Sequence, residues 1–172
     1  MRPSTILVKF HEPALKGRNR PVFINKILRN LKLATKDLPI KNIWHKRLII
    51  GLSINPEAEI SEIAERITNC FGIAKFYPAY EVEKNLDSIF NLLNEILPNI
   101  KFDTFRITAR RPSKNFNLTS DAINRKVGTF VQEFSKSKVQ LKNPDLEIFI
   151  EIMEDKIFVH TEEFKGFGGM PV

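Results

Sequence analysis

The sequence predicts two small α+β domains in succession, and three observations support this fold class. Apolar residues alternate in some segments, as in strands, and recur every three or four residues in others, as in helices. Of the 172 residues, 42% are hydrophobic, which is ordinary for a globular protein and too high for a disordered chain. A polar stretch at 81–85 interrupts the pattern near the middle. We therefore expect domains at 1–80 and 81–165, followed by a glycine-rich tail or linker at 166–172.

The first domain opens with Thr5–Phe10 (TILVKF), which reads as a short buried strand. Asn19 is a candidate cap for the helix that follows, and Pro21 suits a first turn because no backbone N–H is required there. In the strand pair expected over 43–54, one face is predicted to carry Leu48, Ile50, Leu52 and Ile54. With a helix over 60–67 and a strand over 71–80, the order β-α-β-β-α-β is the ferredoxin-like pattern.

The second domain has the same mixed character. Leucine, isoleucine and phenylalanine recur at helical steps over 86–97, and Pro98 stops that helix. The strand at 105–110 alternates apolar residues with a charged face. Another helix is expected to start near Thr119 or Ser120, and two closing strands contain the alternating residues of 148–152 and 157–159.

The net charge of +7 is unevenly distributed along the chain. The residues from Val127 to the end carry a net charge of −3, so the first 126 residues carry +10. A basic surface favours polyanions such as nucleic acid or anionic lipid. No apolar run approaches the roughly 20 residues of a membrane-spanning helix, and no signal peptide is evident. Cys70 is the only cysteine, which excludes an internal disulfide, so we expect a reducing cytoplasm and no membrane association.

The segment 106–125 (RITARRPSKNFNLTSDAINR) is the strongest candidate site. Its arginines can each donate two hydrogen bonds to a phosphate, and the start of the next helix adds free N–H groups. Phe116 could stack on an unpaired base, a contact worth ~1–3 kcal/mol. The alternative is a solvated basic strand edge, with Phe116 folded back onto the core.

A second basic cluster precedes the first helix and contains Lys16, Arg18 and Arg20. Alone it would read as a polar connection with a helix cap. Two such clusters in separate domains strengthen each other, because an extended RNA makes several phosphate contacts at once.

Sites for catalysis are weaker in this sequence. Its three histidines lack the spacing of metal ligands, and the glycines at 166–169 are not followed by the Gly-Lys-Ser/Thr of a phosphate loop. We therefore expect no metal, no cofactor and no catalytic residue.

Five segments together resemble a known family. LKGRNRPVF (15–23), the step Phe71-Gly72-Ile73, RITARRPSKNFNLTSDAINRKVG (106–128), VQLKNPDLEIFIEI (139–152) and GFGGMPV (166–172) occur in the order found in the N-terminal half of tRNA 4-thiouridine synthetases, the tRNA sulfurtransferases. The resemblance covers essentially the whole chain. It implies a ferredoxin-like domain followed by a THUMP domain, an RNA-binding α/β module.

The resemblance also implies a role in 4-thiouridine formation at position 8 of tRNA. In the family these domains grip the acceptor stem and the 3′ CCA end, and a PP-loop domain carries out the ATP-dependent chemistry. Its SGGxDS loop does not occur here, and His11-Glu12-Pro13-Ala14 departs from the usual Gly-Glu-Ile before LKG. The implied RNA-binding residues are Lys16, Arg18, Asn19, Arg20, Arg110, Arg111, Lys114, Asn115, Phe116, Ser120, Asn124 and Lys142.

We accordingly expect a chain that is not catalytic by itself. Its expected partners are tRNA and either a separate PP-loop ATP pyrophosphatase protein or a C-terminal domain missing from this sequence; a homodimer is left open. Two alternatives remain. One is an RNA-binding subunit for another tRNA modification enzyme, such as a methyltransferase. The other is a small ferredoxin-like acyl-phosphate hydrolase, with Arg18 and Asn19 at its loop.

Overall fold

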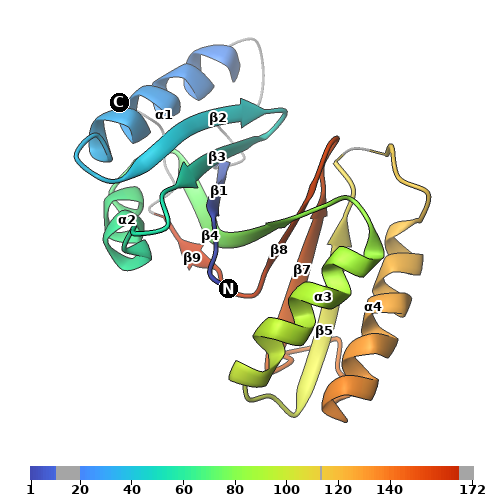
Figure 1. Cartoon of the computed structure of the whole chain (residues 1–172). Helices are drawn as coiled ribbons and strands as arrows, with labels where there is room; N and C mark the ends of the chain where they lie inside the picture. Colours follow the sequence, from blue (N-terminus) through green and yellow to red (C-terminus); the bar gives the residue numbers. More distant parts are fainter. Residues whose placement is uncertain (11–19, 113, 167–172) are drawn as a thin grey trace. The chain divides into compact units, whose positions relative to one another are not determined.

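The computed structural model of this chain describes residues 1–10, 20–112 and 114–166. It divides into two compact units (Figure 1). One contains Pro3–Ala79 and the residues from Glu162 onward, and the other contains Met1–Arg2 and Tyr80–Thr161. Among the described helices, none combines the length and the apolar character that a membrane crossing requires.

The first unit has the predicted ferredoxin-like order. It consists of β1 (Thr5–Phe10), α1 (Arg20–Ala34), β2 (Ile40–Lys46), β3 (Ile49–Ile54), α2 (Ile60–Thr68) and β4 (Ile73–Val82). The strands are antiparallel in the order β2-β3-β1-β4. Buried residues of both helices and of the sheet form one apolar core, including Ile27, Leu52 and Ile63. Gly72 enters β4 with a φ of 89°, a conformation that glycine adopts without steric cost.

Two features of this unit differ from the sequence-based expectation. Leu48 was expected on the buried face of a strand, but it lies in the turn between β2 and β3 and is 42% exposed. The turn is made by Arg47, whose φ of 53° leaves the strand region, so the alternation begins only at Ile50. The second difference is β9 (Phe164–Lys165), which pairs antiparallel with β4. Residues 162–165 are grouped with the first unit, through the pairing of β9 with β4.

The second unit has the α+β arrangement that the sequence predicts. Its helices are α3 (Leu86–Ile96), the short 3-10 turn η2 (Leu97–Asn99) and α4 (Ser120–Ser135), and its strands are β5 (Thr104–Arg110), β6 (Lys138–Val139), β7 (Leu146–Ile152) and β8 (Ile157–His160). Tyr80–Val82 of β4 pair with β8, and the order continues through β7 and β5 to β6. β5 is parallel to β6 and β7. Helices α3 and α4 pack side by side against this sheet (Figure 1), where their apolar residues share one core with those of the strands.

Capping side chains fix where the helices of the second unit begin. The Asn85 side chain accepts a hydrogen bond from the Ser88 N–H at 2.7 Å, and the Thr119 hydroxyl accepts one from the Ala122 N–H at 3.1 Å. Each cap satisfies one of the N–H groups that a helix leaves unpaired at its start. The start of α4 at Ser120, directly after Thr119, confirms the sequence-based expectation.

Candidate nucleic-acid interface

Arg110 stands at the end of β5, on the charged face of that strand. Its Nη1 lies 3.0 Å from Oε1 of Glu151, its register partner on β7, and its guanidinium lies 5.1 Å above the centroid of the Phe149 ring. Glu151 is 1% exposed, whereas the Arg110 side chain remains 32% exposed. The carboxylate and the ring therefore hold this arginine in one orientation while part of it stays accessible.

The neighbouring residue, Arg111, is used differently. Its Nη2 donates to the carbonyl oxygens of Lys114 at 3.1 Å and Phe116 at 3.4 Å. These bonds close the loop between β5 and α4 around the arginine. The Phe116 ring packs against the apolar core of the unit, as in the alternative drawn from the sequence. Stacking of Phe116 on a base and phosphate binding by Arg111 remain predictions.

Further along this loop, Lys114 and Asn115 are exposed, and Ser120 is the first residue of α4. Asn124, one turn later, accepts a hydrogen bond from the Ala109 N–H through its Oδ1 at 2.9 Å. That bond ties α4 to β5 and leaves the side-chain NH₂ group for other partners. The loop and the start of α4 thus bring most of the predicted residues of this segment to one end of the unit.

Lys142 does not belong to that group. It follows β6, where the Gln140 side chain donates to the carbonyl oxygens of Lys142 at 2.7 Å and Asn143 at 3.0 Å. The carbonyl next to it, from Leu141, accepts a bond from Arg106 at the beginning of β5. A strand rises about 3.3 Å per residue, so Arg106 and Arg110 lie roughly 13 Å apart along β5. Lys142 follows the residue bound by Arg106, whereas the other predicted residues of this unit lie near Arg110.

The other predicted cluster lies mostly outside the described residues. Lys16, Arg18 and Asn19 fall in the segment 11–19, whereas Arg20 is exposed as the first residue of α1. The sequence around it is strongly basic. Residues 20–47 contain one acidic side chain, Asp37, and eight basic ones: Arg20, Lys26, Arg29, Lys32, Lys36, Lys41, Lys46 and Arg47.

The two units differ sharply in net charge. Residues 80–161 contain 12 basic and 12 acidic side chains, so with Arg2 the second unit has a net charge of +1 and the first unit has the remaining +6. Asp37, the single acid of the basic stretch, is held by Arg66 at 2.7 Å, and this pairing lowers the pKa of Asp37 to about 2. The basic potential of the first unit is therefore concentrated on α1 and the β2–β3 hairpin.

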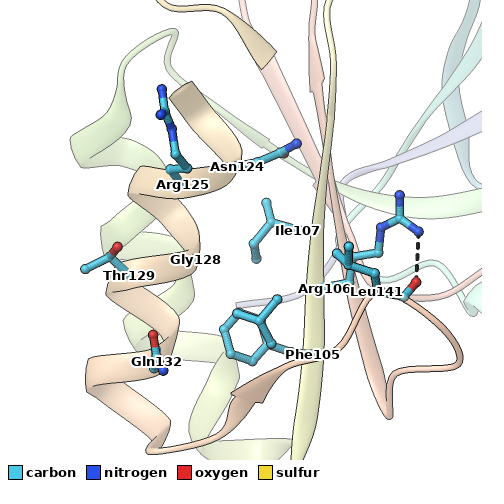
Figure 2. Close-up of a pocket in the computed structure, with 10 residues that line it drawn as sticks. Phe105, Arg106, Ile107, Asn124, Arg125, Gly128, Thr129, Gln132 and Leu141 are labelled. Atoms are coloured by element: carbon cyan, nitrogen blue, oxygen red, sulfur yellow. Dashed lines mark hydrogen bonds between the residues drawn. The ribbon is translucent and has the colours of Figure 1, made fainter. Parts of the chain in front are cut away.

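A groove of about 450 Å³ lies beside α4 in the second unit (Figure 2). Its lining residues come from β5, from α4 and from β6 with the loop that follows: Phe105, Arg106, Ile107, Asn124, Arg125, Gly128, Thr129, Gln132, Val139 and Leu141. Of the sequence-predicted site residues, it contains Asn124. The four-residue spacing of Asn124, Gly128 and Gln132 places them on one helix face, but this spacing alone does not reveal the groove.

The described residues contain no cluster suited to holding a metal ion. Over residues 1–10, 20–112 and 114–166, no three histidine, cysteine or acidic side chains lie close enough to hold a metal ion. Cys70 is buried at the end of α2, and burial raises the pKa of its thiol.

Two known protein families match the chain, one for each unit. Residues 5–77 match the ThiI ferredoxin-like domain, and residues 83–162 match the THUMP domain. The chain is a ThiI ferredoxin-like domain followed by a THUMP domain. This confirms the resemblance found in the sequence and both parts of the predicted fold class.

Curated relatives that match the chain are named as probable tRNA sulfurtransferases. The chain is 31% identical to a probable tRNA sulfurtransferase of Enterococcus faecalis and 33% identical to that of Staphylococcus epidermidis. Each match covers 100% of this chain and 43% of the relative. The ferredoxin-like and THUMP domains thus span less than half the length of the relatives they match.

Solved structures share the same fold. A crystal structure of a protein from Pyrococcus horikoshii matches with a TM-score of 0.87 at 33% identity, over 98% of this chain and 57% of that one. A 4-thiouridine synthetase crystallised with RNA and ATP matches with a TM-score of 0.80, over 99% of this chain and 44% of that one. At 20% identity, this second match shows the likeness in fold alone.

Proposed function

We propose that this chain binds tRNA at the acceptor stem and the 3′ CCA end, and that it serves 4-thiouridine formation at position 8. The observation that carries the proposal is the pairing of a ThiI ferredoxin-like domain with a THUMP domain, in relatives named tRNA sulfurtransferases. The chain binds and positions the RNA and is not catalytic by itself. A PP-loop ATP pyrophosphatase, as a further domain or as a separate polypeptide, carries out the chemistry in the cytoplasm.

The charge distribution supports a role in holding a polyanion. Eight basic side chains against one acid over residues 20–47 give α1 and its hairpin a positive potential that attracts phosphate groups. The α1 sequence itself contains no acidic residue. At ordinary helix rise, its 15 residues extend over about 22 Å, a length along which several phosphates of an RNA duplex are presented.

The loop of the THUMP domain supports phosphate binding through a different mechanism. The start of α4 carries free N–H groups and the positive end of the helix dipole. The exposed Lys114 lies in the loop that leads into this helix, and the Arg111 hydrogen bonds fix the course of that loop. Backbone groups that are already held by hydrogen bonds lose less conformational freedom when a phosphate binds.

The test is tRNA binding by the intact chain, measured for wild type and for two lysine variants. Lys114→Ala removes a cation of the proposed interface and should weaken binding several-fold, with a shallower dependence on salt. Lys101→Ala is the matched control, because Lys101 is an exposed lysine of the same domain that precedes the start of β5. Equal affinities for the two variants would place the interface elsewhere, and wild-type protein that does not bind tRNA would refute the proposed function.

A further inference from the structure

Gly128 occupies a position on α4 where glycine has no evident structural necessity. A glycine within a helix costs about 1 kcal/mol relative to alanine. A Cβ atom at this position would meet Cγ1 of Ile107 at 3.9 Å, which is ordinary van der Waals contact. Among the described residues, packing around α4 therefore leaves room for a Cβ atom and does not demand a glycine here. The lack of a side chain at Gly128 keeps the groove beside α4 open (Figure 2).

The strand side of this groove presents one unused pair of backbone groups. On this edge of β5, the Phe105 carbonyl accepts the Gln140 N–H at 2.9 Å, and the Ala109 N–H donates to Asn124 at 2.9 Å. Alternate residues of a strand direct their backbone groups to the same side. The N–H and C=O of Ile107 therefore face the groove, and no hydrogen bond engages them on this side within the part of the chain that the structure describes.

The remaining walls combine apolar surface with polar groups. Val139 and Leu141 are 52% and 67% exposed, so they offer apolar contact to anything that enters. Thr129 and Gln132 line the helix side, and Arg125 is an exposed cation of the same lining. The groove thus offers apolar walls, a donor and an acceptor side by side on one strand residue, and a positive charge at its boundary.

We propose that this groove binds one unpaired nucleobase of the RNA, an inference that rests on the proposed function and assigns it a base-binding position. A base has apolar faces that suit Val139 and Leu141, and an edge on which donors and acceptors alternate to match Ile107. Arg125 is suited to the attached phosphate. An added peptide strand fits less well, because the edge is occupied on both sides of Ile107 and strand addition uses a row of backbone groups.

The experiment fills the groove from Gly128 in the intact chain. Gly128→Leu projects a side chain into the space and should weaken tRNA binding about tenfold or more, because the base would lose its hydrogen bonds with Ile107 and its contact with the apolar walls. Gly128→Ala, with its smaller side chain, should have an intermediate effect. Asn94→Leu is the matched control, because it adds a leucine to an exposed position of α3 outside the groove. Thermal unfolding of each variant separates lost folding from lost binding.

A second measurement uses only wild-type protein. We expect a fluorescence change on binding for a tRNA that carries 2-aminopurine at one unpaired position of its 3′ end, tested position by position. Wild-type affinity in Gly128→Leu, or unchanged fluorescence at every unpaired position, would overturn the groove assignment while tRNA binding itself stands. Failure of wild-type protein to bind any tRNA would instead overturn the proposed function.

Discussion

Arg110 and Glu151 face each other in register on the parallel strands β5 and β7, with Nη1 and Oε1 3.0 Å apart. The carboxylate is almost fully buried, whereas about a third of the arginine side chain is exposed. His160 on β8 adds a ring stacked on Phe149, with centroids 4.7 Å apart, and its Nε2 lies 3.6 Å from the same Glu151 oxygen. Arg110 therefore contributes to the stability of the sheet as well as being a proposed RNA contact.

Replacing Arg110 should lower the free energy of unfolding. Arg110→Ala removes the guanidinium from a buried carboxylate, and we expect a loss of about 2–3 kcal/mol, measured by urea denaturation. Arg106→Ala is the control, because its pair with Glu147 is longer, at 3.8 Å, and more exposed. That variant should lose less than about 1 kcal/mol. Equal losses for the two variants would contradict the role given to Glu151.

The Asp37–Arg66 pair predicts a pH dependence of stability in the ferredoxin-like domain. Arg66 donates to both carboxylate oxygens, at 2.7 and 2.9 Å, and lowers the pKa of Asp37 from 3.8 to about 2. Because the folded-state pKa is the lower one, the pair stabilises the fold above about pH 4, and this contribution is lost as the pH falls toward 2. Asp37→Asn should be less stable than wild type at pH 6, and the difference should shrink at pH 2–3. A difference that is independent of pH would contradict this account.

Trp44 and Gly51 form a cross-strand pair in which the indole occupies the space of a side chain. A Cβ atom at Gly51 would lie 2.0 Å from Cζ2 of Trp44, so Gly51→Ala must displace the ring and weaken its hydrogen bond to Ser53. We expect a loss of about 1–3 kcal/mol. Trp44 is the only tryptophan, so its fluorescence reports the displacement directly. An unchanged emission spectrum would show that the ring does not pack on the glycine.

Asp145 fastens the beginning of β5 in the THUMP domain. Its Oδ2 accepts the N–H groups of Asp103 at 2.9 Å and Thr104 at 3.2 Å, and its own N–H donates to the Thr104 hydroxyl. Asp145→Ala should lower stability by about 2 kcal/mol, since it removes hydrogen bonds to a charged acceptor. Hydrogen exchange should show faster exchange of the Asp103 and Thr104 amides. Protection equal to wild type at both amides would contradict the role of this carboxylate.

Much of the fold follows from periodicity in the sequence, because long amphipathic elements carry many repeats of the same signal. Helices α3 (Leu86–Ile96) and α4 (Ser120–Ser135) are examples. The two-residue strands β6 and β9 could not be predicted, since two residues contain no period. Leu48 was misplaced because strand alternation does not mark where a turn interrupts it.

The site was harder to predict because a residue type does not specify its partner. Arg110 and Arg111 are adjacent residues of the same type. Arg111 nonetheless donates to carbonyl oxygens of its own loop, whereas Arg110 pairs with a buried carboxylate. Those partners lie on a later loop residue and on a strand some 40 residues away, so local sequence does not reveal them. The groove beside Gly128 likewise could not be predicted from the α4 sequence alone, because β5 forms its other wall.

The most direct test of the account is binding of full-length tRNA by this chain at two salt concentrations, with and without the 3′ CCA. We predict salt-sensitive binding that weakens markedly when the CCA is removed, because phosphate contacts on both domains combine with contacts to the unpaired end. Binding that is indifferent to the CCA, or absent at low salt, would contradict the assignment of this chain to the acceptor end of tRNA.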